Sequence, residues 1–225
     1  TNIPPHNLCE VIDGICAQIH NPDITLDELM QRVKGPDFPT GCIICGVNGI
    51  HQYFETGRGS IKVRGKAGVE ELKGGREQIV ITQIPYGVNR ATLVERIAQL
   101  VNEKVLTDIS YVGDQSDENT RVVIELKRDA NPKVIIANLY KHTALESSFA
   151  ATMLAIDHGR PKLLPLKDAN AVYIDHRREV VLRRTRYELR KAEERAETLE
   201  GYLIALSNLD EFLRIIRGSA NREEA

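Results

Sequence analysis

The sequence predicts an α+β protein in which helices pack on a mixed or antiparallel sheet, followed by a long, protruding coiled-coil helix. Apolar positions change between helical spacing and β-like alternation several times before residue 165. Residues 167–206 then contain no proline and a single glycine, Gly201. We divide the chain into a helical segment at 1–40, an α+β domain at 41–165, a long helix at 166–206 and a further helical region at 207–225.

Two helices are expected between residues 4 and 33. Pro4 and Pro5 preset the backbone for the first helix, and Asn21-Pro22-Asp23 ends it. Thr25 and Glu28 form a capping box that starts the second helix. The apolar residues of the first helix follow helical spacing: Leu8, Ile12, Ile15, Cys16 and Ile19.

The next region reads as strands alternating with helices. Turn signals at Asn48-Gly49 and Lys73-Gly74-Gly75 separate three β-like runs, at 42–47, 59–69 and 78–84. There follow a helix at about 90–104, strands at about 107–113 and 120–127, a helix capped by Asn131 with Pro132 at its first position, and an extended stretch at 145–164 interrupted by Gly159-Arg160-Pro161.

The long helix carries a heptad seam, because its apolar or small residues recur at alternating steps of three and four. A helix of about 40 residues would be roughly 60 Å long, and the chain offers no second helix of that length. The partner of the seam is therefore missing or belongs to another chain. The seam residues are Leu182, Thr185, Leu189, Ala192, Ala196, Leu199, Leu203 and Leu206. A short helix is expected from Leu209 to about Arg217.

Composition limits the classes of function. No apolar run approaches the roughly 20 residues of a membrane span, and the first residues lack the features of a signal peptide, so we expect a cytoplasmic protein without membrane contacts. The absence of a starting Met suits an excised fragment. The four cysteines, Cys9, Cys16, Cys42 and Cys45, are expected to be buried, reduced thiols. The net charge of −2 means that nucleic-acid binding would require cations gathered on one face.

Such a gathering is predicted on the strand near residue 60. Alternate residues of a strand share a face, which places Arg58, Ser60, Lys62, Arg64 and Lys66 together as a basic stripe. Cations at steps of about 7 Å match the spacing of phosphates along a nucleic-acid strand. The stripe indicates phosphate binding, and the alternative is an ordinary solvated face of an antiparallel sheet.

Three other patterns bear on chemistry. Cys42-x-x-Cys45 has no second ligand pair for zinc, so we expect no metal site. The histidines are scattered, and no residue spacing indicates a catalytic site. The arginines near the start of the long helix are interleaved with acids, which favours exposed salt bridges over a binding site. They are Arg177, Arg178, Arg183, Arg184 and Arg186.

Short motifs along the whole chain are informative as a set. They are Thr1-Asn2-Ile3-Pro4-Pro5-His6-Asn7-Leu8, Asn21-Pro22-Asp23-Ile24-Thr25, Gly35-Pro36-Asp37-Phe38-Pro39-Thr40, Thr56-Gly57-Arg58-Gly59, Ile84-Pro85-Tyr86, Lys127-Arg128-Asp129-Ala130, His158-Gly159-Arg160-Pro161 and His176-Arg177-Arg178-Glu179-Val180-Val181. Together these motifs resemble the A subunits of bacterial type IIA topoisomerases. Asn2 and Phe38-Pro39-Thr40 favour gyrase over topoisomerase IV.

The resemblance implies that residues 1–40 lead from a winged-helix domain into a tower domain at 41–165, and that the exit-gate region starts at 207–225. It implies non-sequence-specific binding and bending of a double-stranded gate segment. An isoleucine at the position of Ile3 would wedge between base pairs. Arg58, Lys62, Arg64 and Lys66 would contact phosphates of the duplex arms.

The resemblance also implies that the parent enzyme introduces negative supercoils by ATP-dependent double-strand passage, as an A2B2 assembly with a second A subunit. Its Mg²⁺ and ATP would be held by the B subunit, with no cofactor on this chain. The nucleophilic tyrosine would lie upstream, so we expect no catalytic residue here and no activity of the chain alone. Two alternatives remain: the tower of a topoisomerase IV A subunit, or else a non-catalytic α+β interaction module that dimerises through its coiled coil.

Overall fold

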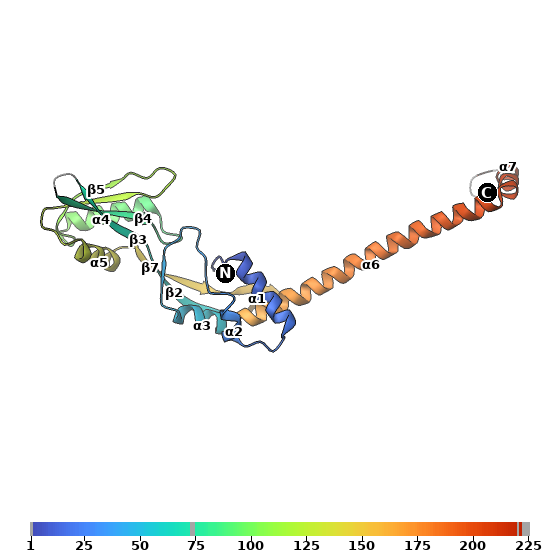
Figure 1. Cartoon of the computed structure of the whole chain (residues 1–225), viewed down its shortest axis with the longest axis horizontal. Coiled ribbons are helices and arrows are strands. Elements are labelled where there is room, and N and C mark those ends of the chain that lie inside the picture. Colours follow the sequence, from blue (N-terminus) through green and yellow to red (C-terminus); the bar gives the residue numbers. More distant parts are fainter. Residues whose placement is uncertain (1, 73–74, 220, 222–225) are drawn as a thin grey trace. The chain divides into compact units, whose positions relative to one another are not determined.

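The computed structural model describes residues 2–72, 75–219 and 221. The chain forms two compact units, one ending at Val172 and one starting at Tyr173. In the first unit the strands pair antiparallel in sheets of three, four and two strands, with helices packed on them (Figure 1). The predicted α+β class is therefore confirmed.

The two N-terminal helices are α1 (Leu8–His20) and α2 (Leu26–Met30). The side chain of Asn7 caps α1 by accepting hydrogen bonds from two backbone N–H groups of its first turn. The capping box of Thr25 and Glu28 is present as predicted. Both helices therefore begin where local side chains satisfy the free backbone donors.

The buried face of α1 differs from the apolar pattern in the sequence. A side chain at Gly14 would meet Val33 at 2.8 Å, and the residues that α1 buries are Gly14 and Gln18. The helix packs through the face that permits the closest approach, and this leaves Leu8 71% exposed. Ile12 and Ile19 are also exposed, as are Cys9 and Cys16, so the prediction of buried thiols is wrong for these two cysteines.

The first sheet has the order β1-β2-β7, from β1 (Ile43–Cys45), β2 (Arg58–Arg64) and β7 (Glu146–Thr152). Helix α3 (Asn48–Thr56) packs on it, although Asn48-Gly49 was predicted to be a turn. The helix packs closely on β2 because Gly49 has no side chain and lies directly against the Ser60 carbonyl. The core beneath includes Leu29, Tyr53, Phe54, Ile61 and Val63.

The second sheet has the order β3-β4-β6-β5, from β3 (Lys66–Leu72), β4 (Arg76–Gln83), β5 (Ile109–Asp114) and β6 (Val122–Leu126). Helices α4 (Arg90–Asn102) and α5 (Pro132–His142) contribute to its core. That core includes Ile79, Ile81, Ile97, Ile124 and Leu139. A turn was predicted at Lys73-Gly74-Gly75, and the first two of these residues lie outside the described residues.

The single strand predicted at 59–69 is two strands in two different sheets. The chain crosses from β2 to β3 at Gly65, whose N–H donates to the Leu145 carbonyl at 2.7 Å. A side chain at Gly65 would meet Leu145 at 2.5 Å and the Gln83 carbonyl at 2.6 Å, so only glycine fits this crossing. Lys66 therefore belongs to β3 and not to the strand of Arg58.

A small hairpin of β8 (Leu154–Asp157) and β9 (Arg160–Leu163) precedes α6 (Leu166–Ser207), the predicted long helix, which has 42 residues. Helix α7 (Leu209–Gly218) follows it. All eight seam residues are exposed within the described part of the chain. No helix among the described residues is long and apolar enough to span a membrane.

Candidate nucleic-acid interface

The predicted alternation of β2 is present for four of the five residues of the basic stripe. Ile61 and Val63 are 1% and 2% exposed and face the core. Arg58, Ser60 and Lys62 are exposed on the opposite face, where Arg64 is half-buried. The expectation that Lys66 shares this face is wrong, because the chain changes sheets at Gly65.

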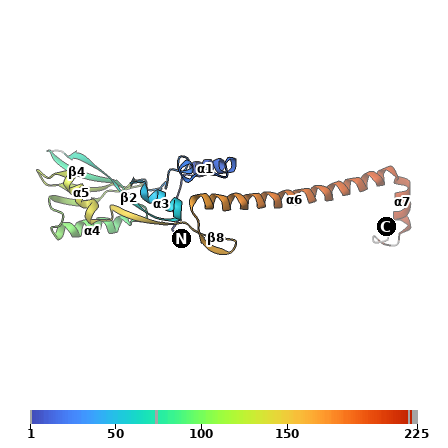
Figure 2. The same cartoon turned by 90° about the horizontal axis from the view of Figure 1, so that it is seen from below.

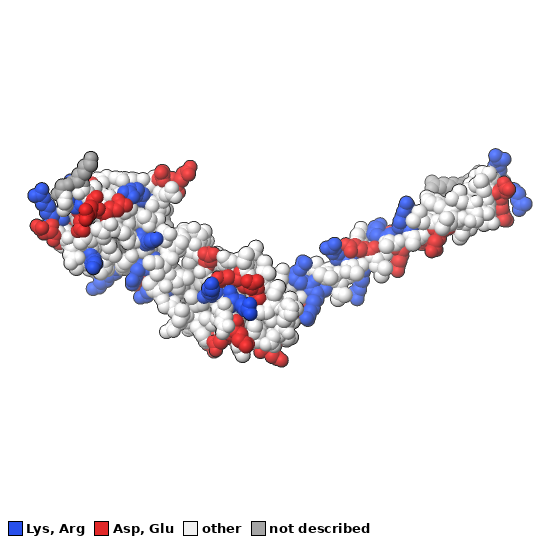
Figure 3. Space-filling view, in the orientation of Figure 1, with Lys and Arg blue, Asp and Glu red and all other residues white. Residues whose placement is uncertain are grey.

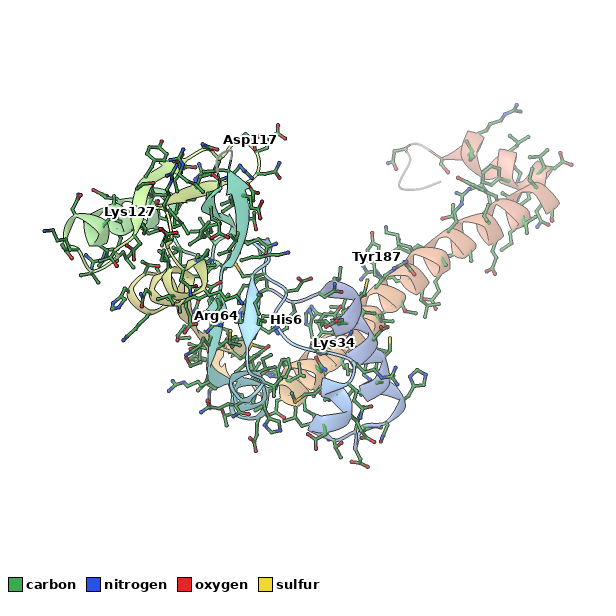
Figure 4. The ribbon with its side chains drawn as sticks, turned by 60° about the vertical axis from the view of Figure 1, so that its left-hand side comes forward. His6, Lys34, Arg64, Asp117, Lys127 and Tyr187 are labelled. Carbon is green, nitrogen blue, oxygen red and sulfur yellow. The ribbon has the colours of Figure 1, made fainter. Side chains whose placement is uncertain are left out.

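Two of these cations already have an acidic partner. The Nζ of Lys62 lies 3.2 Å from one oxygen of Glu146, and the Nε of Arg64 donates to its other oxygen at 2.7 Å. The guanidinium of Arg64 also lies 4.6 Å from the ring centre of Tyr140. The hydrogen bond from Arg64 lowers the pKa of Glu146 below its ordinary value, with Lys62 contributing. Figure 4 shows Arg64 on β2 at the junction of the two sheets.

Glu146 was missed in the sequence because it is 82 residues from Arg64. It is the direct partner of Arg64 in the pairing of β2 with β7. The sequence of one strand shows the charges on that strand, but it does not show which charges the neighbouring strand places beside them. The three side chains of Lys62, Arg64 and Glu146 together carry one net positive charge.

Arg58 is placed by the turn that precedes it. Gly57, at φ 77°, ends α3 in the left-handed region. The Thr56 hydroxyl accepts from the Arg58 N–H at 3.2 Å and donates to the Arg58 carbonyl at 2.9 Å. Among the described residues, the Arg58 side chain forms no ion pair. Its charge is therefore available to a ligand.

The N-terminal segment joins the same sheet. Asn2 pairs with Thr152 through two backbone hydrogen bonds of 3.3 and 2.9 Å, and its side chain donates to the Ala150 carbonyl at 2.6 Å. Thr152 also pairs with Arg58 on its other side. Since neighbouring strands lie about 4.8 Å apart, the backbones of Asn2 and Arg58 are roughly 10 Å apart. The residue after Asn2, Ile3, is 49% exposed.

The chain after Ile3 is firmly held. Pro4 is buried, and the Pro5 carbonyl accepts from the Asp37 N–H at 2.8 Å. The Nε2 atom of His6, which is labelled in Figure 4, lies 2.7 Å from the Tyr53 hydroxyl. The His6 ring stacks on Phe54. Ile3 precedes the Asn7 cap by four residues, so it cannot be the hydrophobic staple of α1. Ile3 therefore exposes an apolar side chain directly before a backbone segment that burial and hydrogen bonds fix in place.

His6 is expected to make the fold less stable in acid. Its burial lowers its pKa below the ordinary 6.5. The unfolded chain then binds this proton more readily, so the stability from neutral His6 is complete above pH 6.5 and is lost as the pH falls toward the folded pKa. Urea unfolding at several pH values would detect this, with a slope of at most about 1.4 kcal/mol per pH unit. His6→Gln should flatten the dependence; the same change at exposed His142 should not.

The other patterns have structural explanations. On α6, Arg183 pairs with Glu179 at 3.0 Å and Arg184 with Glu188 at 2.7 Å. These pairs confirm the expected salt bridges, and Figure 3 shows acidic and basic side chains interleaved there. Cys42 and Cys45 are free, partly buried thiols. Across residues 2–72, 75–219 and 221, no three His, Cys, Asp or Glu side chains are grouped as metal ligands.

Comparison with known proteins identifies the family. The family model for the A subunit of DNA gyrase/topoisomerase IV matches residues 1–225. The chain belongs to this family, which confirms the resemblance inferred from the motifs. It is 51% identical over 221 residues to the DNA gyrase A subunit of Staphylococcus epidermidis, covering 97% of this chain and 25% of the relative.

Two further gyrase A subunits are equally similar. The one from Synechocystis is 52% identical over 230 residues, covering 100% of this chain and 27% of the relative. The one from Haemophilus influenzae is 50% identical over 226 residues, covering 100% of this chain and 26% of the relative. The chain thus spans about a quarter of the length of the relatives that it matches.

Proposed function

We propose that this chain binds and bends the gate segment of duplex DNA within a type IIA topoisomerase that introduces negative supercoils by ATP-dependent strand passage. One observation carries the proposal. The row of Asn2, Thr152 and Arg58 joins the exposed Ile3 to the exposed Arg58 at the same end of one sheet, and Arg58 has no ion pair among the described residues. An apolar wedge beside a phosphate-binding cation is the combination needed to kink a duplex.

The charges of this face suit the phosphate backbone. Arg58 and Lys62 are four residues apart on β2, about 13 Å along the strand, so they reach phosphates about two steps apart. Arg64 lies between Glu146 and Tyr140, and we assign it a weaker DNA contact than Arg58 or Lys62. Lys66 lies on β3 in the second sheet, so it would contact DNA only where the duplex extends past the edge of the first sheet. Contacts of this kind carry no base code, so binding is expected to be independent of sequence.

Ile3 has the properties of a wedge. Its side chain is half exposed, and the prolines and backbone pairing beside it remove the freedom that would otherwise be lost on insertion. Separating one base step costs a few kcal/mol, which is offset when the bent duplex contacts more of the protein. Arg58 is near enough to contribute to that contact.

Arg58→Ala is expected to weaken binding of the chain to random-sequence duplex by roughly eightfold at 0.1 M salt, because one phosphate contact is lost. The slope of log affinity against log salt should become shallower by about 0.9. Fluorescence anisotropy across a salt series measures both quantities. Lys127→Ala removes an equal charge far from β2 (Figure 4) and is the matched control. An unchanged slope for Arg58→Ala, or no duplex binding by the parent chain, would contradict the proposal.

The remaining parts of the proposal concern the whole enzyme. The partners in its A2B2 assembly are a second A subunit plus the B subunits, which hold Mg²⁺ and ATP. This chain contributes DNA binding and no catalytic residue. Its identity of about half to several gyrase A subunits supports gyrase over topoisomerase IV.

A further inference from the structure

The β8–β9 hairpin is a short projection that is hydrogen-bonded at its base. Its two central turn residues, His158 and Gly159, have φ values of 48° and 78°. Positive φ at both central residues is characteristic of the type I′ turn, whose twist matches that of the two flanking strands in a hairpin with a two-residue loop. Two strands of four residues are not stable alone, and here the base is tied down by the Leu164 N–H, which donates to the Met153 carbonyl at 2.9 Å.

The hairpin has one apolar and one charged face. Residues directly opposite in an antiparallel pair share a face, so Ile156 lies with Pro161, and Asp157 lies with Arg160. Ile156 is 78% exposed. One exposed isoleucine is unremarkable in itself. An isoleucine near the tip of a tied-down projection, with charged residues on the opposite face, suits a ligand that has both charged and apolar parts.

The charges of the hairpin favour an anionic ligand. Arg160 and Lys162 share a face, and within the described chain Arg160 forms no ion pair. Asp157 is the only acid of the hairpin, and it pairs with His158 at 2.7 Å and with Lys162 at 3.8 Å. The charges of Arg160, Lys162 and Asp157 sum to one net positive charge.

The base of the hairpin is continuous with the proposed interface. The Met153 N–H donates to the Gly57 carbonyl at 2.8 Å, directly before Arg58. Thr152, the preceding residue, pairs with both Asn2 and Arg58. Figure 2 shows the hairpin projecting beside the N-terminal end of the chain. Ile3, Arg58 and the hairpin therefore leave from one end of the same sheet.

We infer that the β8–β9 hairpin is a second contact for the same duplex, in which Arg160 and Lys162 bind phosphates and Ile156 packs against the sugars of a groove. This inference rests on the proposed function. Phosphates flanking the apolar sugar edges of a groove provide both kinds of surface that the hairpin presents. The alternative ligand of the hairpin is a protein, such as the B subunit, and the experiment distinguishes it from duplex DNA.

The test uses the full chain with random-sequence duplex across a salt series. The double variant Arg160→Ala, Lys162→Ala should flatten the salt slope by about 1.8 and weaken binding roughly 60-fold at 0.1 M salt. Asp157→Asn removes the only acid and should tighten binding. Ile156→Ser should weaken binding without changing the slope, because it removes no charge. Lys127→Ala is the control, and unchanged thermal unfolding verifies that the variants fold.

Measuring Arg58→Ala in the same salt series distinguishes a failure of the hairpin inference from a failure of the proposed function. If Arg58→Ala flattens the slope and the double variant does not, the hairpin inference is wrong and the proposed function stands. If neither variant changes the slope, the proposed function fails as well. If the double variant binds duplex normally but loses binding to purified B subunit, the hairpin is a protein contact and the inference is overturned.

Discussion

Replacing Gly49 by alanine is expected to destabilise the first unit by about 3 kcal/mol or more, because a new methyl group would collide with rigid backbone. A side chain at Gly49 would overlap the Ser60 carbonyl oxygen and lie 2.9 Å from its carbonyl carbon. Neither atom can rotate away. Gly59 on β2 also has no room for a side chain, since a Cβ at this position would lie 2.5 Å from the Gly49 carbonyl oxygen. Helix α3 would have to move away from β2 and open the core around Tyr53.

Urea unfolding followed by circular dichroism measures this loss. Gly201→Ala is the matched control, since Gly201 also lies in a helix but has no atom within 4 Å of its added side chain. That variant is expected to gain up to about 1 kcal/mol of helix stability. Equal stability of Gly49→Ala and the parent would show that α3 does not depend on this close approach. Because β2 carries Arg58, we also expect Gly49→Ala to lose duplex affinity.

Ile3→Ala is expected to abolish bending of the bound duplex while leaving most of the affinity for its phosphates. The wedge is the only part of the proposed interface that separates base pairs, whereas Arg58 and Lys62 bind a straight or a bent backbone. Smooth bending of a site of 20–30 base pairs costs of order 1–6 kcal/mol. Without the wedge, the bound duplex should relax toward its straight form.

Energy transfer between dyes on the two duplex ends measures the bend. For Ile3→Ala it should fall to the value of free duplex, and for Ile3→Leu, which keeps a large apolar side chain, it should remain high. Leu8→Ala is the control for losing an exposed apolar residue, because Leu8 is 71% exposed on α1. A bend that persists in Ile3→Ala, with the protein bound, would remove Ile3 from the proposed mechanism.

The parts of the structure that short-range interactions control could be predicted. The capping box at Thr25 and Glu28 depends on residues three apart. The alternation along β2 and the 42-residue length of α6 follow from side-chain periodicity. The exposed face of Arg58 and Lys62 was found for the same reason. Family membership was also readable, because short motifs remain recognisable without knowledge of their contacts.

The remaining features depend on segments that meet only after folding. Asn48-Gly49 begins a helix and not a turn, and this helix packs against a carbonyl of β2 at the glycine. Gly65 moves the chain between sheets because Leu145 leaves no room for a side chain. Glu146 partly neutralises the stripe, and Thr152 joins Asn2 to Arg58, through strand pairings spanning 82 to 150 residues. Local sequence sets which side chains alternate or cap, but strand register sets which charges meet, and register is decided by tertiary packing.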